Sequence, residues 1–302
     1  MTSIISVQNL RKTYGKTIAV DDISFDVAEG EIFGLLGPNG AGKTTTVECL
    51  QALRHPDSGN IRVLGLDPRT EAQVLRRRIG SQLQESALPD RIKVWEALDL
   101  FASVTQDALD WRVLLEQWGL AEKRKASFSS LSGGQKQRLF IALALVNKPE
   151  VVFLDEMTTG LDPTARRVAW DLIRAIRNRG ATVVLVTHFM DEAESLCDRV
   201  AVIDHGKIIA AATPQGLITQ YASEVRVIFT TEQADLSWLE KISGVKKVMR
   251  QGPRVEVTGS GPLLALVAAA LVEHSIVPAD LRVEQPSLED VFLKLTGHAA
   301  GD

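Results

Sequence analysis

The spacing of apolar residues predicts that the chain begins with β-structure. Alternating apolar positions predict strands at Ile4–Leu10 and Ile18–Val27, which would pair in an antiparallel layer. The apolar run Ile32–Leu36 is too short for a helix, and a Gly-rich loop follows it. Residues Lys43–Leu53 then have a helical composition. The order is therefore strand, glycine loop and helix.

The middle of the chain predicts a parallel sheet and a helical insertion. Two apolar runs, Val151–Leu154 and Thr182–Val186, flank an expected helix over residues 163–179, which is typical of parallel strands covered by helices. A short hairpin is expected over residues 200–211. Between these parts of the core, residues from about 86 to 148 are rich in Leu, Ala, Trp and charged side chains. We expect them to form a helical subdomain.

The pattern restarts after Tyr221 and predicts a small second domain. Its expected strands and helices, in the order βαββαβ, are Val225–Thr230, Leu236–Ile242, Val245–Met249, Arg254–Thr258, Leu263–His274 and Asp280–Glu284. This order is typical of a ferredoxin-like α+β sandwich. A last helix, Leu288–Leu295, would begin after Ser287 as its cap. We expect domains at residues 1–220 and 221–302.

Composition narrows the class of protein. Of 302 residues 45% are hydrophobic, enough for a real core, and the net charge of −4 argues against a nucleic-acid partner. Cys49 and Cys197 lack metal-ligand spacing, which predicts buried thiols in a reducing compartment. The first residues lack an export signal, and the longest apolar run, Leu263–Val272, is shorter than the roughly 18 residues that span a bilayer. We expect a cytoplasmic protein that acts on membranes only through another polypeptide.

A phosphate-binding loop is expected between the third strand and the helix that follows it. The residues fit G-x-x-x-x-G-K-[ST], in which glycines let backbone N–H groups approach phosphate oxygens. Lys43 supplies positive charge for binding and catalysis, and Thr44 offers a hydroxyl to Mg²⁺. The helix N-terminus favours the same anions, which argues against an ordinary Gly-rich turn. The expected ATP-binding residues are Gly37, Pro38, Asn39, Gly40, Ala41, Gly42, Lys43, Thr44 and Thr45.

Two further motifs carry candidate chemistry. The strand Val151–Leu154 runs into Asp155 and Glu156, which places two carboxylates at the sheet edge where α/β folds bind ligands. Asp155 would bind Mg²⁺, and Glu156 would polarise the attacking water as a catalytic base. The segment Leu131-Ser-Gly-Gly-Gln135 presents a hydroxyl and bare backbone at a helix start, which suits an anion. A plain helix cap is the structural alternative for both motifs.

The order of these motifs resembles that of the ATP-binding cassette ATPases. The resemblance covers residues 1 to about 220 and implies a phosphate-loop NTPase core with an antiparallel β subdomain and an inserted helical subdomain. It also implies a homodimer around two MgATP molecules. In such a dimer Ser132 and Gly134 of one subunit contact the γ-phosphate held by Lys43 of the other, and Gly133 and Gln135 complete the same ATP-binding motif.

The resemblance implies further roles, residue by residue. Tyr14 resembles the aromatic residue that stacks on adenine, and Gln84 resembles the Mg²⁺-sensing glutamine, although Gln82 is a nearby competitor. Asp162 resembles the aspartate of the loop that crosses the dimer interface. His188 resembles the switch histidine that bonds the γ-phosphate, whereas a lone histidine after a strand is more often structural.

One position departs from the family pattern. Met157 follows the Asp-Glu pair, where the family commonly has proline. Because every expected phosphate, metal and water ligand is present, we expect an active ATPase. We expect the backbone at Met157 to differ from that of family members with proline at this position.

The end of the chain narrows the expected function. Residues 286–297 resemble the ends of ATPases that serve type-2 transporters, including the daunorubicin-resistance group. We expect a subunit on the cytoplasmic face of the membrane that drives export of a drug-like, lipid or polymer substrate through a separate permease. The permease would dock near residues 86–95.

Two other classes of cassette ATPase share these motifs. A soluble cassette ATPase of iron–sulfur assembly or of the ribosome-associated type is the alternative. No long heptad segment separates Lys43 from Ser132, which argues against a chromosome-organising ATPase.

Overall fold

The computed structural model describes residues 3–82, 87–222 and 224–297. Its described residues divide into two compact units, one reaching to Pro214 and the other spanning Gln215–Gly297. Each unit has its own hydrophobic core, as described below.

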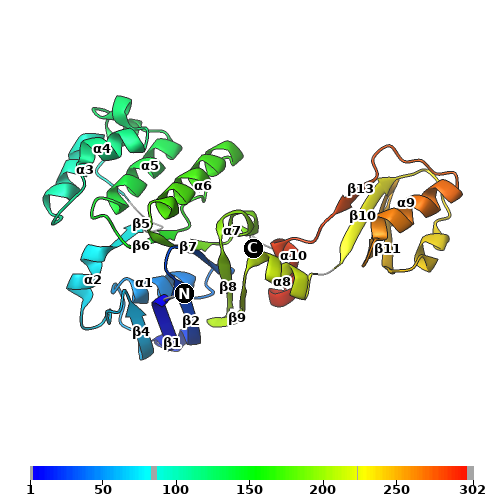
Figure 1. Cartoon of the computed structure of the whole chain (residues 1–302), viewed down its shortest axis with the longest axis horizontal. Coiled ribbons are helices and arrows are strands. Elements are labelled where there is room, and N and C mark those ends of the chain that lie inside the picture. The colour runs from blue at the N-terminus through cyan, green and yellow to red at the C-terminus, as the bar shows by residue number, and fades with distance from the viewer. Residues whose placement is uncertain (1–2, 83–86, 223, 298–302) are drawn as a thin grey trace. The chain divides into compact units, whose positions relative to one another are not determined.

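A six-stranded sheet forms the centre of the first unit, with strand order β5-β6-β7-β3-β8-β9 (Figure 1). All neighbouring strands are parallel except β8 and β9, which form the predicted hairpin. Strands β3, β6 and β7 are buried along their whole length, so their apolar runs lack alternation. The strands are β3 (Ile32–Leu36), β5 (Ile79–Gln82), β6 (Val151–Asp155), β7 (Thr182–Thr187), β8 (Arg199–Asp204) and β9 (Lys207–Ala212).

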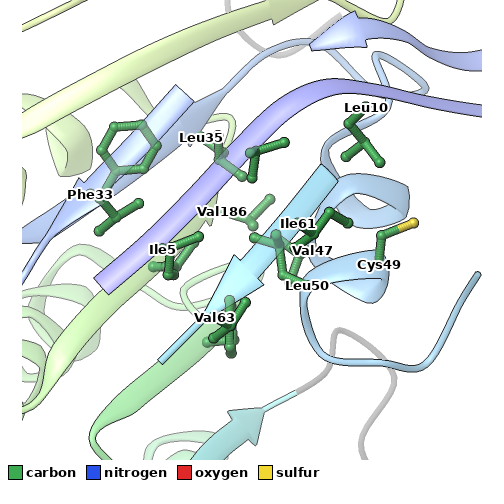
Figure 2. Packing of buried hydrophobic residues seen from close by; sticks show 14 of the residues in the cluster. Ile5, Leu10, Phe33, Leu35, Val47, Cys49, Leu50, Ile61, Val63 and Val186 are labelled. Atoms are coloured by element: carbon green, nitrogen blue, oxygen red, sulfur yellow. The ribbon is translucent and has the colours of Figure 1, made fainter. Parts of the chain in front are cut away.

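A second, antiparallel sheet packs over the helix that follows β3. Its order is β2-β1-β4, with β1 (Ser3–Tyr14), β2 (Thr17–Ala28) and β4 (Ser58–Val63), and the helix is α1 (Lys43–Leu50). Ile5, Ile61 and Val63 of this sheet belong to one buried cluster with Val47 and Leu50 of α1 (Figure 2). The predicted antiparallel layer is thus confirmed, and β4 is an additional strand. This core fixes the position of α1.

Helices gather around residues 94–144, as the sequence predicts. Helix α3 packs against α4 and α5, and α5 also contacts α6 (Figure 1). Trp118, only 1% exposed, lies at the end of α4 among the buried residues. The helices of the first unit are α1, α2 (Ala72–Arg78), α3 (Val94–Ser103), α4 (Trp111–Gln117), α5 (Gly133–Ala144), α6 (Pro163–Asn178) and α7 (Met190–Leu196), with short 3₁₀ turns at Ala121–Lys123 and Phe128–Ser130.

The second unit is the predicted ferredoxin-like sandwich. Its sheet has the order β11-β12-β10-β13 with every pair antiparallel, and its core includes Val227, Phe229 and Val267. The elements of the sandwich are β10 (Val225–Thr230), η3 (Ser237–Lys241), β11 (Val245–Gln251), β12 (Arg254–Gly259), α9 (Leu263–Glu273) and β13 (Arg282–Glu284). Helix α8 (Pro214–Tyr221) precedes them in the chain, and helix α10 (Leu288–Thr296) follows them.

The first helix of this sandwich is shorter than predicted. The expected helix over residues 236–242 is a five-residue 3₁₀ helix, η3. The side chain of Asp235 accepts a hydrogen bond from the backbone N–H of Ser237 at 3.0 Å. This bond lies at the start of the tight 3₁₀ turn. Among the described residues, no helix is long and apolar enough to cross a membrane.

Candidate functional site

The phosphate loop follows β3 and ends at the first turn of α1. Nζ of Lys43 donates to the carbonyl oxygens of Gly37 (2.8 Å) and Pro38 (2.9 Å), so its charge lies inside the curve of the loop. Gly42 has a φ of +101°, and a Cβ added there would lie 2.1 Å from the carbonyl oxygen of Ala19. This position therefore requires glycine. The other loop residues that the sequence predicts to bind ATP are Asn39, Gly40, Ala41, Thr44 and Thr45.

The turn of the β8–β9 hairpin is hydrogen-bonded to the phosphate loop. The backbone N–H of Gly206 donates to the carbonyl of Ala41 at 3.0 Å, and the carbonyl of Gly206 accepts from the N–H of Asp21 at 2.8 Å. One glycine thus joins the phosphate loop, the hairpin and strand β2. The sequence does not predict this contact, because a hairpin turn carries no signal of a distant partner.

Asp155 ends β6 beside the phosphate loop. Its side chain is buried, and its Oδ1 atom has no hydrogen-bond partner in the described part of the chain. Burial raises the pKa of Asp155 to about 6, while the hydroxyl of Thr44 lowers it by hydrogen bonding. A buried carboxylate oxygen without a partner, next to a hydroxyl, suits a hard divalent cation. Asp155 and Thr44 therefore fit Mg²⁺.

Glu156 lies between the lysine of the loop and the histidine that follows β7. Its Oε1 atom is 3.8 Å from Nζ of Lys43 and 3.4 Å from Nδ1 of His188. Burial lowers the pKa of Lys43, and the charges of Glu156 and Asp155 oppose that effect. The fold thus brings together the three residues that the sequence predicts as catalytic base, phosphate-binding lysine and switch histidine.

The backbone turns sharply at Glu156. This residue has a φ of +48°, in the left-handed region, and its N–H donates to the carbonyl of Val186 at 2.9 Å. The next residue, Met157, is buried, and its carbonyl accepts from the side-chain amide of Gln137 in α5. Gln137 is not among the predicted residues, since its only signal is its place two residues after the Leu-Ser-Gly-Gly-Gln motif.

Ser132 and Asp162 both cap helices. The hydroxyl of Ser132 accepts from the N–H of Gln135 at 3.4 Å, and the side chain of Gln135 accepts from the N–H of Ser132 at 3.0 Å. Asp162 accepts from the N–H groups of Thr164 and Ala165, both at 2.9 Å, and starts α6. In the described residues, Ser132 makes no hydrogen bond to the phosphate loop of its own chain. At the tip of α5, Gly133 is exposed and Gly134 is half-buried.

Two of the remaining candidates, Tyr14 and Gln82, are the last residues of β1 and β5. Tyr14 is 41% exposed, and the charged groups of Lys12 and Arg54 each lie 5.6 Å from its ring centroid. Gln82 is buried, and its Oε1 atom lacks a hydrogen-bond partner among the described residues. Gln84 lies outside the described residues, so its assignment as the Mg²⁺-sensing glutamine stays a prediction.

The strand, loop and helix, together with the carboxylates at the end of β6 in the same sheet, define a phosphate-loop ATPase. The model of a family described as ABC transporter matches residues 20–159. The chain is 41% identical to a Nod factor export ATP-binding protein I of Paraburkholderia xenovorans, over 99% of this chain and 98% of that protein. It is 38% identical to a daunorubicin resistance ATP-binding protein, DrrA3, of Streptomyces coeruleorubidus, over 97% of this chain and 96% of that protein.

Solved structures agree with these relatives. A dimeric ATP-binding cassette in a post-hydrolysis state, bound to ADP and phosphate, superposes with a TM-score of 0.63 and 25% identity, covering 69% of this chain and 98% of that chain. The chain therefore belongs to the ABC transporter family, in which it is an ATP-binding and ATP-hydrolysing subunit. The expected resemblance and fold are confirmed.

Proposed function

We propose that two copies of this chain close around two MgATP molecules and that closure drives export through a separate permease. The observation that carries the proposal is the tip of α5. Ser132, Gly133 and Gly134 form a helix N-terminus, in which Ser132 and Gly133 are exposed and Gly134 is half-buried. Among the described residues, the Ser132 side chain makes no hydrogen bond to the phosphate loop of its own chain. Such a tip attracts anions. A second copy would supply the phosphate, and the related dimeric cassette supports this arrangement.

Residues of one copy would have separate roles in binding and hydrolysing ATP. Lys43 and the loop N–H groups bind the phosphates, while Glu156 accepts a proton from the attacking water and His188 binds the γ-phosphate. Tyr14 would stack on adenine. Mg²⁺, held by Thr44, Asp155 and Gln84, supplies positive charge to the transferred phosphoryl group when bound.

Light scattering tests the dimer directly. Glu156→Gln protein is mixed with ATP and Mg²⁺, and we expect its mass to double, because hydrolysis no longer reopens the pair. Adding Ser132→Arg should keep it monomeric, whereas Ser130→Arg, at an exposed residue just before the motif, should still dimerise. A Glu156→Gln protein that stays monomeric with saturating MgATP would refute the proposed arrangement.

The permease would dock in a groove of the first unit. The groove has a volume of about 910 Å³ and is lined by residues of α2, β5, α3 and α5. Phe101 and Val104 on its wall are 41% and 79% exposed, and Arg76 and Arg77 also line it. This lining suits an amphipathic permease helix with an acidic side chain. Ala87 and Leu88, from the stretch expected to dock, line the same groove.

Cysteine crosslinking tests this groove. Because Cys49 and Cys197 are both buried, an added cysteine would be the reactive one. With a thiol-to-amine crosslinker and a co-expressed permease, Val104→Cys should give a crosslinked pair. Val277→Cys, at an 83% exposed residue of the second unit, is the control. Crosslinks through position 277 and none through position 104 would place the docking surface elsewhere.

The names of two relatives support a role in export. One is named for export of Nod factor and the other for resistance to daunorubicin, so we propose a drug-like, lipid or polymer substrate. The subunit would lie on the cytoplasmic face of the membrane, with residues 221–302 as an accessory domain. Membrane fractionation with and without the permease distinguishes this role from that of a soluble assembly ATPase, which would stay in the supernatant in both cases.

A further inference from the structure

Tyr14 is an exposed aromatic residue at the very end of a strand. It is the last residue of β1, and it is 41% exposed. Gly15 follows with a φ of +59°, so the backbone turns directly after the ring. Burial does not fix a side chain in this position, and ordering it on binding costs conformational entropy. A ring that other contacts already hold in place would bind a base more tightly.

The carboxylate of Asp57 binds the residues that directly precede Tyr14. Its Oδ2 atom accepts from the backbone N–H and the hydroxyl of Thr13, both at 2.6 Å, and its Oδ1 atom accepts from Nζ of Lys12 at 2.9 Å. The N–H of Asp57 donates to the carbonyl of Arg11 at 2.9 Å. Hydrogen bonding, most of all from the Thr13 hydroxyl, lowers the pKa of Asp57 to about 2, so the carboxylate is charged at neutral pH. Three consecutive residues of β1 are thus joined to one residue of the segment between α1 and β4.

Two cations lie close to the Tyr14 ring, and an acidic residue holds each of them. Nζ of Lys12 and the guanidinium carbon of Arg54 each lie 5.6 Å from the ring centroid, within the range of cation–π attraction. Lys12 is bound by Asp57, as described above. Glu48, in α1, accepts from Nε of Arg54 at 2.8 Å. The ring is therefore tied through Arg54 to the helix that begins at the phosphate loop.

We propose that Asp57 is a positioning residue that holds the Tyr14 ring at a fixed place relative to the phosphate loop, so that one nucleotide reaches both. Asp57 joins the end of β1 to the segment that leaves α1, and α1 begins at Lys43 of the loop. The ring would then add affinity only for a ligand that has both a base and a triphosphate. This inference rests on the proposed stacking of adenine on Tyr14. Other segments hold the groups that react at the γ-phosphate, so turnover at saturating ATP should change little.

Titration calorimetry with two ligands tests the inference. In Asp57→Ala we expect the Kd for MgATP to rise by about fivefold or more, the effect of losing one base–aromatic stack. The Kd for magnesium tripolyphosphate, which has no base, should stay within twofold, and so should kcat at saturating ATP. Asp26→Ala is the matched control, because Asp26 is an exposed acidic residue of the same sheet that pairs with Arg199. It should leave all three values unchanged.

The same change in a Tyr14→Ala background shows whether Asp57 acts through the ring. There Asp57→Ala should raise the Kd for MgATP less than twofold further, because the two losses are not additive when one residue acts through the other. The inference is overturned if Asp57→Ala weakens MgATP binding equally with and without the ring, weakens the binding of both ligands together, or changes neither Kd by more than twofold.

Two further variants complete the test. Thr13→Val removes one hydrogen bond to Asp57 with little change in volume, and it takes the place of Asp57→Ala in every measurement if that variant does not fold. Tyr14→Ala alone should raise the Kd for MgATP and spare that for tripolyphosphate. Unchanged MgATP affinity in Tyr14→Ala would refute the proposed stacking of adenine itself.

Discussion

Oε1 of Glu156 lies 3.4 Å from Nδ1 of His188, although the two residues come from different strands. Their strands, β6 and β7, are parallel neighbours in the central sheet. Parallel neighbours end at the same edge, so the residues that follow them meet there. Two short motifs that are distant in sequence thus become one site. Their contact depends on the register of Asp155 against Val186.

Glu156→Gln should stop turnover and spare ATP binding. The amide keeps the size of the side chain but cannot accept a proton, and general bases contribute about 10²- to 10⁴-fold to rate. We therefore expect phosphate release to fall at least 100-fold with the Kd for ATP within threefold of wild type. Turnover near the wild-type rate would remove Glu156 from its role.

Gly42→Ala should weaken ATP binding. The new Cβ would lie 2.1 Å from a backbone oxygen at a φ of +101°, and strained backbone of this kind costs about 1–3 kcal/mol. The loop would have to move, so we expect at least a tenfold rise in the Kd for ATP, measured by titration calorimetry. Gly180→Ala is the control, since Gly180 has a φ of +94° with open space around it. Equal losses of ATP affinity in both variants would contradict this explanation.

Phe229→Ala should destabilise the second unit. Phe229 is fully buried in the core of the sandwich, and truncating such a side chain costs about 3–5 kcal/mol. We expect a lower unfolding temperature by calorimetry, with ATP affinity unchanged below that temperature. Val277→Ala, at an exposed residue, should change the stability by less than about 0.5 kcal/mol. Loss of ATP affinity at low temperature would show that the sandwich supports the ATP site.

Both native cysteines should resist alkylation. Burial raises the pKa of Cys49 from 9.0 to about 11 and that of Cys197 well above 9.0. The thiolate is the reactive form, so at pH 8 only about one Cys49 in a thousand would be ionised even if reagent reached it. Iodoacetamide at pH 8 should label the denatured chain and leave the native chain unlabelled, by mass spectrometry. Because unfolding restores the lower pKa, the stabilising contribution of Cys49 is complete below pH 9 and is lost as the pH rises toward 11.

The sequence predicts the phosphate loop and its partners well because their chemistry dictates residue type and spacing. Gly42 and Lys43 are recognisable from the motif alone. Gly42 is recognisable because few residues other than glycine adopt the backbone conformation that the loop needs. Strand β6 is visible as an apolar run that ends in two acids. The register that joins Glu156 to His188 follows only from the sheet order.

Other features of the structure are only weakly indicated by the sequence. Strand β4 is not predicted because its six residues, Ser58–Val63, begin with polar residues and glycine. In the sequence Glu192 resembles any acidic residue in the first turn of a helix, where the helix dipole stabilises negative charge. Its burial depends on the long-range packing of α6 and α7.

The contact of Gly206 with Ala41 and Asp21 has a consequence for the order of folding. The chain emerges from the ribosome N-terminus first, and long-range contacts form only when both ends are available. The ATP loop is made early, yet the glycine that steadies it comes from residue 206. A nascent chain that ends before β8 would thus carry the loop sequence without its support. Nucleotide would first be held firmly late in synthesis, after most of the first unit has been translated.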